Sequence, residues 1–355
     1  MSMRVHVLYE TDRLGQPHGC SHIRLLRPLQ HPSLADQLKV SHGTYLPDGV
    51  LDAVIVERYW RPDTTLEAID ELVAALRQRG IRLIYTLDDN LLDVERHQAW
   101  YATADSVQCH KVARFLRLAD GVIVSTEALK QRCKKLNPRI AVVENALDEQ
   151  LFLPADSHEP PQPWRNNERL TIGYMGTFSH LQDLMMVLEP LRTVLREAAG
   201  LVEFQIVGIA QEESLAACFD GLPFRVLDTG GKHFYPDFVA WARQNLCWDL
   251  AIAPLVDNAF TRCKSDIKFL DYSLLGIPGI YSQVEAYRQS VHHGETGWLC
   301  PNDPAAWIES LLHAIGHREQ RGSISASAFK QVEESRMLRT CAGRWLCALD
   351  TFQVN

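Results

Sequence analysis

Two lysines and a carboxylate lie close together in one stretch of the chain. Lys264, Lys268 and Asp271 are spaced four and three residues apart, so a helix would present them on one face. Ser265 is a favourable N-cap and Gly276 suits the position just beyond a helix C-terminus, so we expect a helix between them. Cations and free N–H groups at a helix start suit a diphosphate, and a carboxylate suits ribose hydroxyls. The stretch predicts a nucleotide-diphosphate site; the alternative is a solvated helix on which Lys268 and Asp271 pair with each other.

The same stretch continues into a longer pattern. Gly-x-Pro at 276–278, Gly-x-Thr-Gly at 294–297 and Asn-Asp-Pro at 302–304 follow in this order. With these motifs, residues 170–315 resemble the C-terminal domain of the nucleotide-sugar glycosyltransferases of the GT-B fold, above all glycosyltransferase family 4, the group 1 glycosyltransferases. Residues 1–150 resemble that family more loosely. The resemblance implies two doubly wound, Rossmann-like α/β domains that face each other across a cleft. It also implies a nucleotide-diphosphate sugar as donor substrate, with no cofactor and no metal.

The resemblance also assigns a donor site. Gly176 follows a predicted strand, and a glycine there lets backbone N–H groups approach a phosphate; the alternative is a plain tight turn. Family 4 enzymes usually carry an arginine and then a lysine after this glycine, whereas this chain has Thr177 and then Gln182 or Asp183 in that stretch. We therefore expect cations further along the chain to supply the charge. The predicted donor-binding residues are Gly176, Thr177, Arg262, Lys264, Ser265, Lys268 and Asp271.

A pair of glutamates contacts the donor in family 4. Asp271, five residues before Gly276, matches the second glutamate, which binds the ribose. Cys263 stands where the first glutamate, which contacts the transferred sugar, would lie. The resemblance favours transfer with retention of the anomeric configuration over inversion, and the cysteine leaves the sugar-side contacts and this outcome open.

Two carboxylates follow a predicted strand in the first half of the chain. The strand ends at Thr86, and Asp88 and Asp89 lie just beyond it. Family 4 enzymes often have Thr-x-His here, with the histidine beside the donor sugar, so Asp88 takes the place of that histidine. Asp88 is the candidate catalytic residue, which would accept the proton of an acceptor hydroxyl or hold a sugar hydroxyl. The alternative is that Asp88 or Asp89 only caps the next helix.

The acceptor side is expected in the loop after the first strand. This loop contains Gly15 and Gly19 and leads into a helix, as the acceptor loop does in the resembling enzymes. Ser21, His22 and Arg24 are the candidate acceptor-side residues, because an arginine can bind a phosphate or carboxylate bidentately. The alternative for His22 is an ordinary histidine near a helix start.

These sites need elements to position them, and strand-like runs alternate with helical patterns along the whole chain. Strands are expected at 5–9, 38–41, 53–57, 82–86, 121–124, 141–144, 171–175, 203–207, 224–227, 249–253, 279–281 and 298–299. Helical periods occupy 65–79 and 107–118. The proline-rich stretch 154–169 is the predicted linker between an acceptor-side domain, 1–153, and a donor-binding domain, 170–336. The GT-B resemblance implies that a C-terminal helix in 337–355 packs back on the first domain.

Composition narrows the function classes. The chain has 355 residues, 46% of them hydrophobic, and a formal net charge of −8, which argues against a nucleic-acid partner. Its nine cysteines include no Cys-x-x-Cys pair and no His/Cys cluster with metal-ligand spacing. This pattern is typical of reduced thiols, and it predicts no metal site. No apolar run approaches the ~20 residues of a membrane-spanning helix. We expect a cytoplasmic protein.

A basic cluster bears on membrane contact. Lys130, Arg132, Lys134 and Lys135 lie close together in an otherwise acidic chain. Such a run is commonly a solvated helix face, but it also suits the anionic lipids at the inner face of a membrane. Peripheral membrane contact through these residues is one hypothesis.

The function predicted from these features is transfer of a hexosyl or deoxyhexosyl group from a nucleotide-diphosphate sugar to a hydroxyl. The acceptor would be a glycan or a lipid-linked molecule in cell-surface polysaccharide assembly. Two alternatives remain: a nucleotide-sugar epimerase of the same fold, and a non-catalytic sugar-nucleotide-binding subunit.

Overall fold

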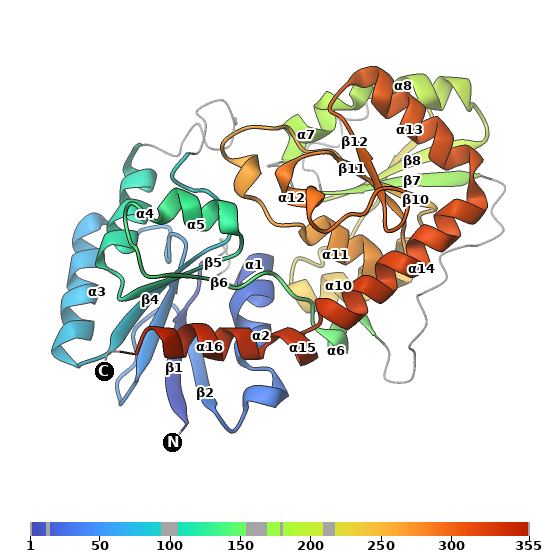
Figure 1. Cartoon of the computed structure of the whole chain (residues 1–355). Helices are drawn as coiled ribbons and strands as arrows, with labels where there is room; N and C mark the ends of the chain where they lie inside the picture. Colours follow the sequence, from blue (N-terminus) through green and yellow to red (C-terminus); the bar gives the residue numbers. More distant parts are fainter. Residues whose placement is uncertain are drawn as a thin grey trace. The chain divides into compact units, whose positions relative to one another are not determined.

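Figure 1 shows the computed structural model of the chain, which describes residues 2–11, 15–93, 106–153, 169–177, 180–208 and 217–353. The chain forms two compact units, and each contains a six-stranded parallel sheet with helices around it. Unit 1 comprises Met1–Asp148, Ala259–Ser265 and Arg336–Asn355, and unit 2 comprises Glu149–Asn258 and Asp266–Ser335. The predicted α/β class with two doubly wound, Rossmann-like domains is confirmed.

The sheet of unit 1 has the strand order β2-β1-β3-β4-β5-β6, with every neighbouring pair parallel. Its strands are β1 (Met3–Leu8), β2 (Leu38–Gly43), β3 (Ala53–Glu57), β4 (Arg82–Leu87), β5 (Gly121–Val124) and β6 (Ile140–Val142). Each strand predicted in this half is found, with its ends within a few residues of the expected positions. The switch in chain order between β1 and β3 is where such sheets open toward a ligand at their carboxyl ends.

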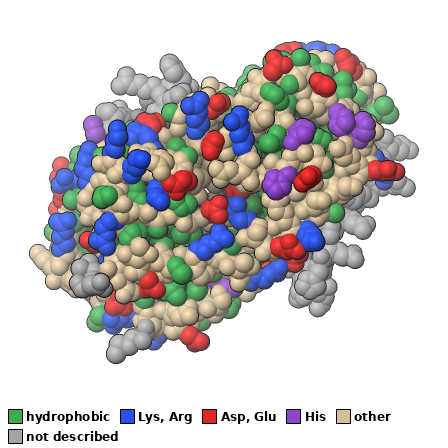
Figure 2. Space-filling view, in the orientation of Figure 1, with side chains coloured by type: hydrophobic (Ala, Val, Ile, Leu, Met, Phe, Trp, Pro, Cys, Tyr) green, Lys and Arg blue, Asp and Glu red, His purple; other side chains and the backbone are tan. Residues whose placement is uncertain are grey.

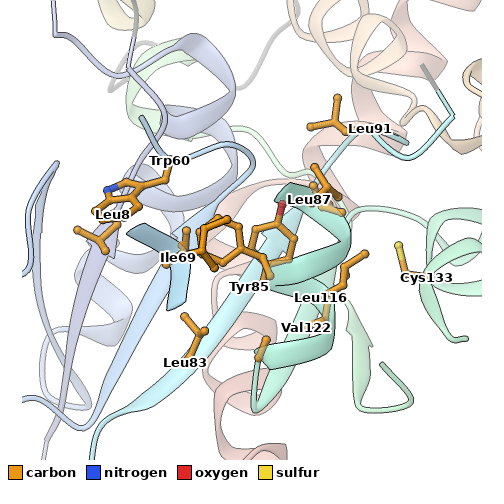
Figure 3. Close-up of a cluster of buried hydrophobic side chains, with 14 of the residues drawn as sticks. Leu8, Trp60, Ile69, Leu83, Tyr85, Leu87, Leu91, Leu116, Val122 and Cys133 are labelled. Atoms are coloured by element: carbon orange, nitrogen blue, oxygen red, sulfur yellow. The ribbon is translucent and has the colours of Figure 1, made fainter. Parts of the chain in front are cut away.

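Helices cover both faces of the unit 1 sheet. On one face, Val54 and Val56 of β3 pack in a hydrophobic cluster with α3 (Leu66–Gln78), α4 (Ser106–Leu118) and α5 (Glu127–Cys133), part of which appears in Figure 3. On the other face, Ala53 and Ile55 pack with α2 (Arg27–Leu29) and α16 (Gly343–Thr351). The alternation along β3 follows from the two-residue period of a strand. Thr65 and Thr126 cap α3 and α5, each accepting a backbone N–H at 3.1 Å.

The C-terminal segment also belongs to unit 1. Where one helix was expected, the structure has two, α15 (Leu338–Cys341) and α16. Trp345 and Leu349 of α16 are buried in the same cluster as Ile55, and Arg82 donates to the carbonyl of Leu349 at 3.1 Å. Of the predicted linker, only Arg169 lies within the described residues.

The sheet of unit 2 has the strand order β12-β11-β10-β7-β8-β9, again parallel throughout. Its strands are β7 (Leu170–Met175), β8 (Val202–Val207), β9 (Phe224–Val226), β10 (Leu250–Ala253), β11 (Gly279–Ser282) and β12 (Trp298–Cys300). All six were predicted. The helices of unit 2 whose bounds fall within the described residues include α6 (Glu149–Phe152), α7 (Leu181–Met186), α8 (Leu188–Glu197), α10 (Tyr235–Asn245), α11 (Ile267–Leu274), α12 (Glu285–Arg288), α13 (Pro304–Gly316) and α14 (Arg318–Ser335).

The helix predicted from Ser265 begins later than expected. Asp266 is the N-cap of α11, so Lys264 and Ser265 lie outside the helix, and the prediction that Lys264 shares its face with Lys268 is wrong. The physical reason is that the preceding segment is held in unit 1, where Ser265 Oγ accepts a hydrogen bond from Asn145 Nδ2 at 2.7 Å. The predicted end is confirmed. Gly276 has φ 71°, and Ile277 N–H donates to the carbonyl of Tyr272 at 2.8 Å, closing a Schellman motif.

The segment Ala259–Ser265 is part of unit 1, although it lies inside the stretch predicted as the donor domain. Phe260 and Cys263 are 3% and 5% exposed and pack in the cluster that also contains Val54 and Val56. The carbonyl of Cys263 accepts from Thr126 Oγ1 at 2.9 Å. Apolar burial and side-chain hydrogen bonds therefore hold this segment in the first unit.

No helix among the described residues is both long enough and apolar enough to cross a membrane.

Candidate active site

A cluster of charged side chains lies at the carboxyl ends of three neighbouring strands in unit 1. Glu10 follows β1, Arg58 follows β3, and Asp88 and Asp89 follow β4. Arg58 binds Asp88 in a bidentate manner, with Nε 2.5 Å from Oδ1 and Nη2 2.8 Å from Oδ2. Arg58 Nη2 also lies 3.2 Å from Asp89 Oδ2, and Nη1 lies 3.4 Å from Glu10 Oε2. One guanidinium therefore holds three carboxylates.

The backbone of Arg58 is strained. Its φ of 43° lies in the left-handed region, which costs an arginine of order 1–3 kcal/mol. Two hydrogen bonds maintain this conformation: Arg58 N–H donates to the carbonyl of Thr86 at 3.1 Å, and the Tyr85 hydroxyl donates to the carbonyl of Arg58 at 2.7 Å. Such strain is characteristic of functional sites. Here it aims the guanidinium at Asp88.

Glu57, the last residue of β3, is a fourth acidic group in this cluster. Its side chain is buried, and Oε2 accepts from Ser21 Oγ at 2.5 Å and from Glu10 N–H at 2.9 Å. Oε1 has no hydrogen-bond partner among the described residues. Burial raises the pKa of Glu57 from 4.5 to about 7, and the charge of Asp88 adds to this, while the Ser21 hydrogen bond and Arg58 oppose it. Glu57 therefore exchanges a proton near neutral pH.

We expect Glu57 to make stability fall as pH rises. Because its pKa is higher in the folded protein, the folded state binds a proton that the unfolded chain has released between pH 4.5 and about 7. Its favourable contribution is complete below pH 4.5 and is lost by about pH 7, at up to about 1.4 kcal/mol for each pH unit. The Glu57→Gln variant should therefore gain stability relative to the wild type between pH 5 and pH 8 in urea titrations. A constant difference across this range would contradict the shifted pKa.

Lys264 belongs to the same cluster. Its Nζ lies 3.3 Å from Asp89 Oδ1 and 4.8 Å from the centre of the Phe260 ring. The structure thus places Lys264 beside Asp89 in unit 1, and Lys268 and Asp271 in unit 2. Arg262, also in unit 1, is exposed in a short 3-10 helix, Thr261–Cys263. Cys263, at the position of the family's first glutamate, is buried in the hydrophobic core of unit 1.

The three acceptor-side candidates lie on neighbouring turns. Ser21 donates to Glu57 and so reaches the charged cluster. His22 is 6% exposed, and burial lowers its pKa to about 4, so it is neutral at pH 7. Arg24 is 2% exposed and lies in a π-helical turn, His22–Leu26, where Nη1 donates to Asn145 Oδ1 at 2.9 Å and the guanidinium lies over the Trp345 ring. These contacts are internal, and an acceptor role for the three residues stays a prediction.

In unit 2, the turn after β7 depends on glycine. A Cβ on Gly176 would lie 2.9 Å from the Tyr174 hydroxyl oxygen, and a Cβ on Gly208, after β8, would lie 2.7 Å from the carbonyl oxygen of Gly176. The Tyr174 side chain at Gly176 and the backbone of Gly176 at Gly208 therefore lie too close for a larger residue at either position. Thr177 follows in the turn, and the next helix, α7, has only six residues.

Lys268 and Asp271 lie on one face of α11, as their spacing predicted. Lys268 is 7% exposed, and its Nζ lies 5.3 Å from the centre of the Tyr174 ring. Burial raises the pKa of Asp271 to about 7, and Lys268 partly opposes this shift. Tyr272 anchors the helix to the sheet, since its hydroxyl accepts from Met175 N–H at 3.1 Å and donates to the carbonyl of Ile252 at 3.2 Å. A cation and a titratable carboxyl group are thus fixed near the end of β7.

Sequence reasoning missed Glu57 and Arg58. One signal was present, because an apolar strand, Ala53–Val56, runs directly into an acidic and a basic residue. What could not be read is the left-handed backbone at Arg58, which directs its side chain at Asp88.

Comparison with known proteins gives a family match and several solved structures of the same fold. Residues 169–317 match the family model described as glycosyl transferases group 1. Anabaena HepE in complex with UDP-glucose is 15% identical, with a TM-score of 0.66 over 98% of this chain and 100% of that one. A glycosyltransferase from Rickettsia africae is 11% identical, with a TM-score of 0.65 over 100% of both chains.

Sucrose-phosphate synthase from Thermosynechococcus elongatus is 15% identical, with a TM-score of 0.59 over 85% of this chain and 75% of that one. No curated protein matches by sequence. At these identities, the structural similarity establishes the fold, which is that of the GT-B enzymes.

Proposed function

We propose that this chain, a group 1 glycosyltransferase by the match of residues 169–317, transfers a hexosyl or deoxyhexosyl group from a nucleotide-diphosphate sugar to a hydroxyl. The acceptor is a glycan or a lipid-linked molecule, and the role is in the assembly of a cell-surface polysaccharide. One observation carries the donor side of the proposal: α11 presents Lys268 and Asp271 on one face, with Lys268 beside the Tyr174 ring. The complex of HepE, which has the same fold, with UDP-glucose supports a nucleotide sugar as the ligand.

In this proposal, Lys268 and the backbone N–H groups of the Gly176–Thr177 turn neutralise the leaving diphosphate, and no metal is needed. Asp271 binds the ribose hydroxyls. Asp88 accepts the proton of the acceptor hydroxyl or holds a sugar hydroxyl. Arg58 occupies one direction on each Asp88 oxygen, and a carboxylate oxygen has a further lone pair for such a contact. Retention of configuration is part of the proposal, and the anomeric coupling constant of the product, measured by NMR, tests it.

We expect Lys268→Ala to weaken binding of a nucleoside diphosphate far more than binding of the bare nucleoside. Loss of a charge-assisted contact costs on the order of 1.5–3 kcal/mol of binding free energy. The nucleoside has no phosphate for Lys268 to contact, so its binding is not affected by this loss. Isothermal titration with both ligands measures the difference. Equal effects on the two ligands would remove Lys268 from the phosphate site.

Two variants serve as controls for Lys268→Ala. Asp271→Asn should weaken binding of both ligands, because each contains the ribose that Asp271 is proposed to bind. Lys264→Ala removes a lysine that contacts Asp89 in unit 1 and tests whether that lysine also contributes to phosphate binding, as its place among the predicted donor residues implies.

A thermal-shift screen tests the function as a whole. Nucleoside diphosphates of the common bases, and the corresponding nucleotide sugars, are added to the full chain. A ligand at about 100 times its Kd should stabilise the folded protein by about 2.7 kcal/mol. Release of the free nucleoside diphosphate with sugar transfer to an acceptor supports the transferase. Sugar interconversion without an acceptor favours the epimerase, and binding without turnover across acceptors favours the non-catalytic subunit.

Peripheral membrane contact stays a proposal for the basic cluster Lys130, Arg132, Lys134 and Lys135. Part of its charge is paired within the chain: Arg132 binds Asp93, and Lys130 Nζ lies 3.6 Å from Glu127 Oε2. The face shown in Figure 2 carries acidic side chains among the basic ones. Cosedimentation with anionic and neutral vesicles tests the contact.

A further inference from the structure

The turn after β7 in unit 2 is short of positive charge. From Leu170 to Met186, the sequence contains no lysine or arginine, and His180 is its one side chain able to carry a positive charge. The diphosphate proposed to bind at this turn carries more negative charge than Lys268 alone neutralises. His180 lies close to the turn, because its N–H donates to the carbonyl of Thr177 at 3.0 Å.

A buried carboxylate holds His180 in place. Nδ1 of His180 lies 2.8 Å from Asp183 Oδ2, and the Asp183 side chain is 5% exposed. The other oxygen of Asp183 accepts from Val256 N–H at 2.9 Å, which ties α7 to the loop after β10, the strand beside β7 in the sheet. The carboxylate therefore cannot turn away. A carboxylate on one ring nitrogen stabilises the imidazolium and orients the other ring nitrogen as a donor.

Tyr174 links His180 to Lys268. The Tyr174 hydroxyl lies 3.4 Å from the carbonyl oxygen of His180, and the Tyr174 ring lies beside Lys268 Nζ. The backbone of His180 and the side chain of Lys268 thus both approach one tyrosine at the carboxyl end of β7. Asp183 and Asp271 are the acidic groups of α7 and α11 in this arrangement.

We propose that His180, oriented by Asp183, binds the diphosphate of the donor together with Lys268. This inference rests on the proposed function, since it specifies how the same donor site recognises its ligand. His180 then supplies at the turn the positive charge that an arginine or a lysine would otherwise provide.

The test is isothermal titration of the full chain with uridine diphosphate and uridine, or with the pair whose base binds best in the thermal-shift screen. His180→Gln should lower affinity for the diphosphate about 10- to 100-fold and leave the nucleoside within about twofold. His180→Lys should restore much of the diphosphate affinity, because it restores a cation. Asp183→Asn keeps an oxygen for Val256 N–H but removes the charge behind the imidazole, so we expect a smaller, diphosphate-selective loss.

His292→Gln is the matched control, because His292 is an exposed histidine of unit 2, and it should change neither affinity. If the wild-type chain binds none of the nucleotides, the proposed function fails and this inference with it. If the wild type binds and His180→Gln binds equally well, only this inference is overturned. Equal losses for diphosphate and nucleoside, or no rescue by lysine, would also overturn it.

Discussion

Replacing Asp88 by asparagine is expected to lower turnover by roughly 10²–10⁴-fold if Asp88 takes the acceptor proton, while donor affinity changes little. The amide keeps the shape of the side chain but loses the negative charge that faces Arg58 and nearly all of the basicity. Initial rates with donor and acceptor, together with the Kd of the donor, measure the effect. If Asp88 instead orients the donor sugar, affinity for the nucleotide sugar falls while affinity for the nucleoside diphosphate does not.

Asp89→Asn is the matched control for this experiment. Asp89 also contacts Arg58, at 3.2 Å, and it additionally contacts Lys264, so it reports the effect of removing one carboxylate from the same cluster. Thermal unfolding of both variants separates catalysis from stability. Wild-type turnover with normal binding in Asp88→Asn would leave Asp88 a structural partner of Arg58.

Arg58→Met is expected to destabilise the folded protein by about 3–5 kcal/mol. The Arg58 side chain is 19% exposed, and the three carboxylates it holds are 14–19% exposed, so its removal leaves mutually repelling charges in a poorly solvated site. Methionine keeps much of the volume, which limits the contribution of lost packing. Urea unfolding, followed by circular dichroism, measures the change.

A double-mutant cycle assigns the energy of the Arg58 site to its parts. Adding Asp88→Asn to Arg58→Met should recover part of the lost stability, because one of the uncompensated carboxylates is then neutral. Arg58→Lys, which keeps the charge without the bidentate geometry, should fall between wild type and Arg58→Met. A loss below about 1 kcal/mol for Arg58→Met would show that solvent screens this cluster as it does at a surface.

The sequence by itself determined the fold class and the strands. Buried parallel strands must be continuously apolar, as Ala53–Val56 is, and this pattern depends only on local composition. The end of α11 could also be predicted from the sequence. Its Schellman motif requires a left-handed backbone conformation, which Gly276 adopts without steric strain. The position of Lys268 and Asp271 on one face of α11 followed from helical spacing alone.

The tertiary structure decided which of these residues meet. Lys264 and Ser265 are four and three residues from Lys268, yet burial of Phe260 and Cys263 holds their segment in unit 1 beside Asp89 and Asn145. The contacts of Arg58 with Glu10 and Asp88 likewise join residues 48 and 30 positions apart. Periodicity and capping are properties of neighbouring residues. The partners of a buried charge are set by which strand ends lie side by side, and that order exists only once the sheet has formed.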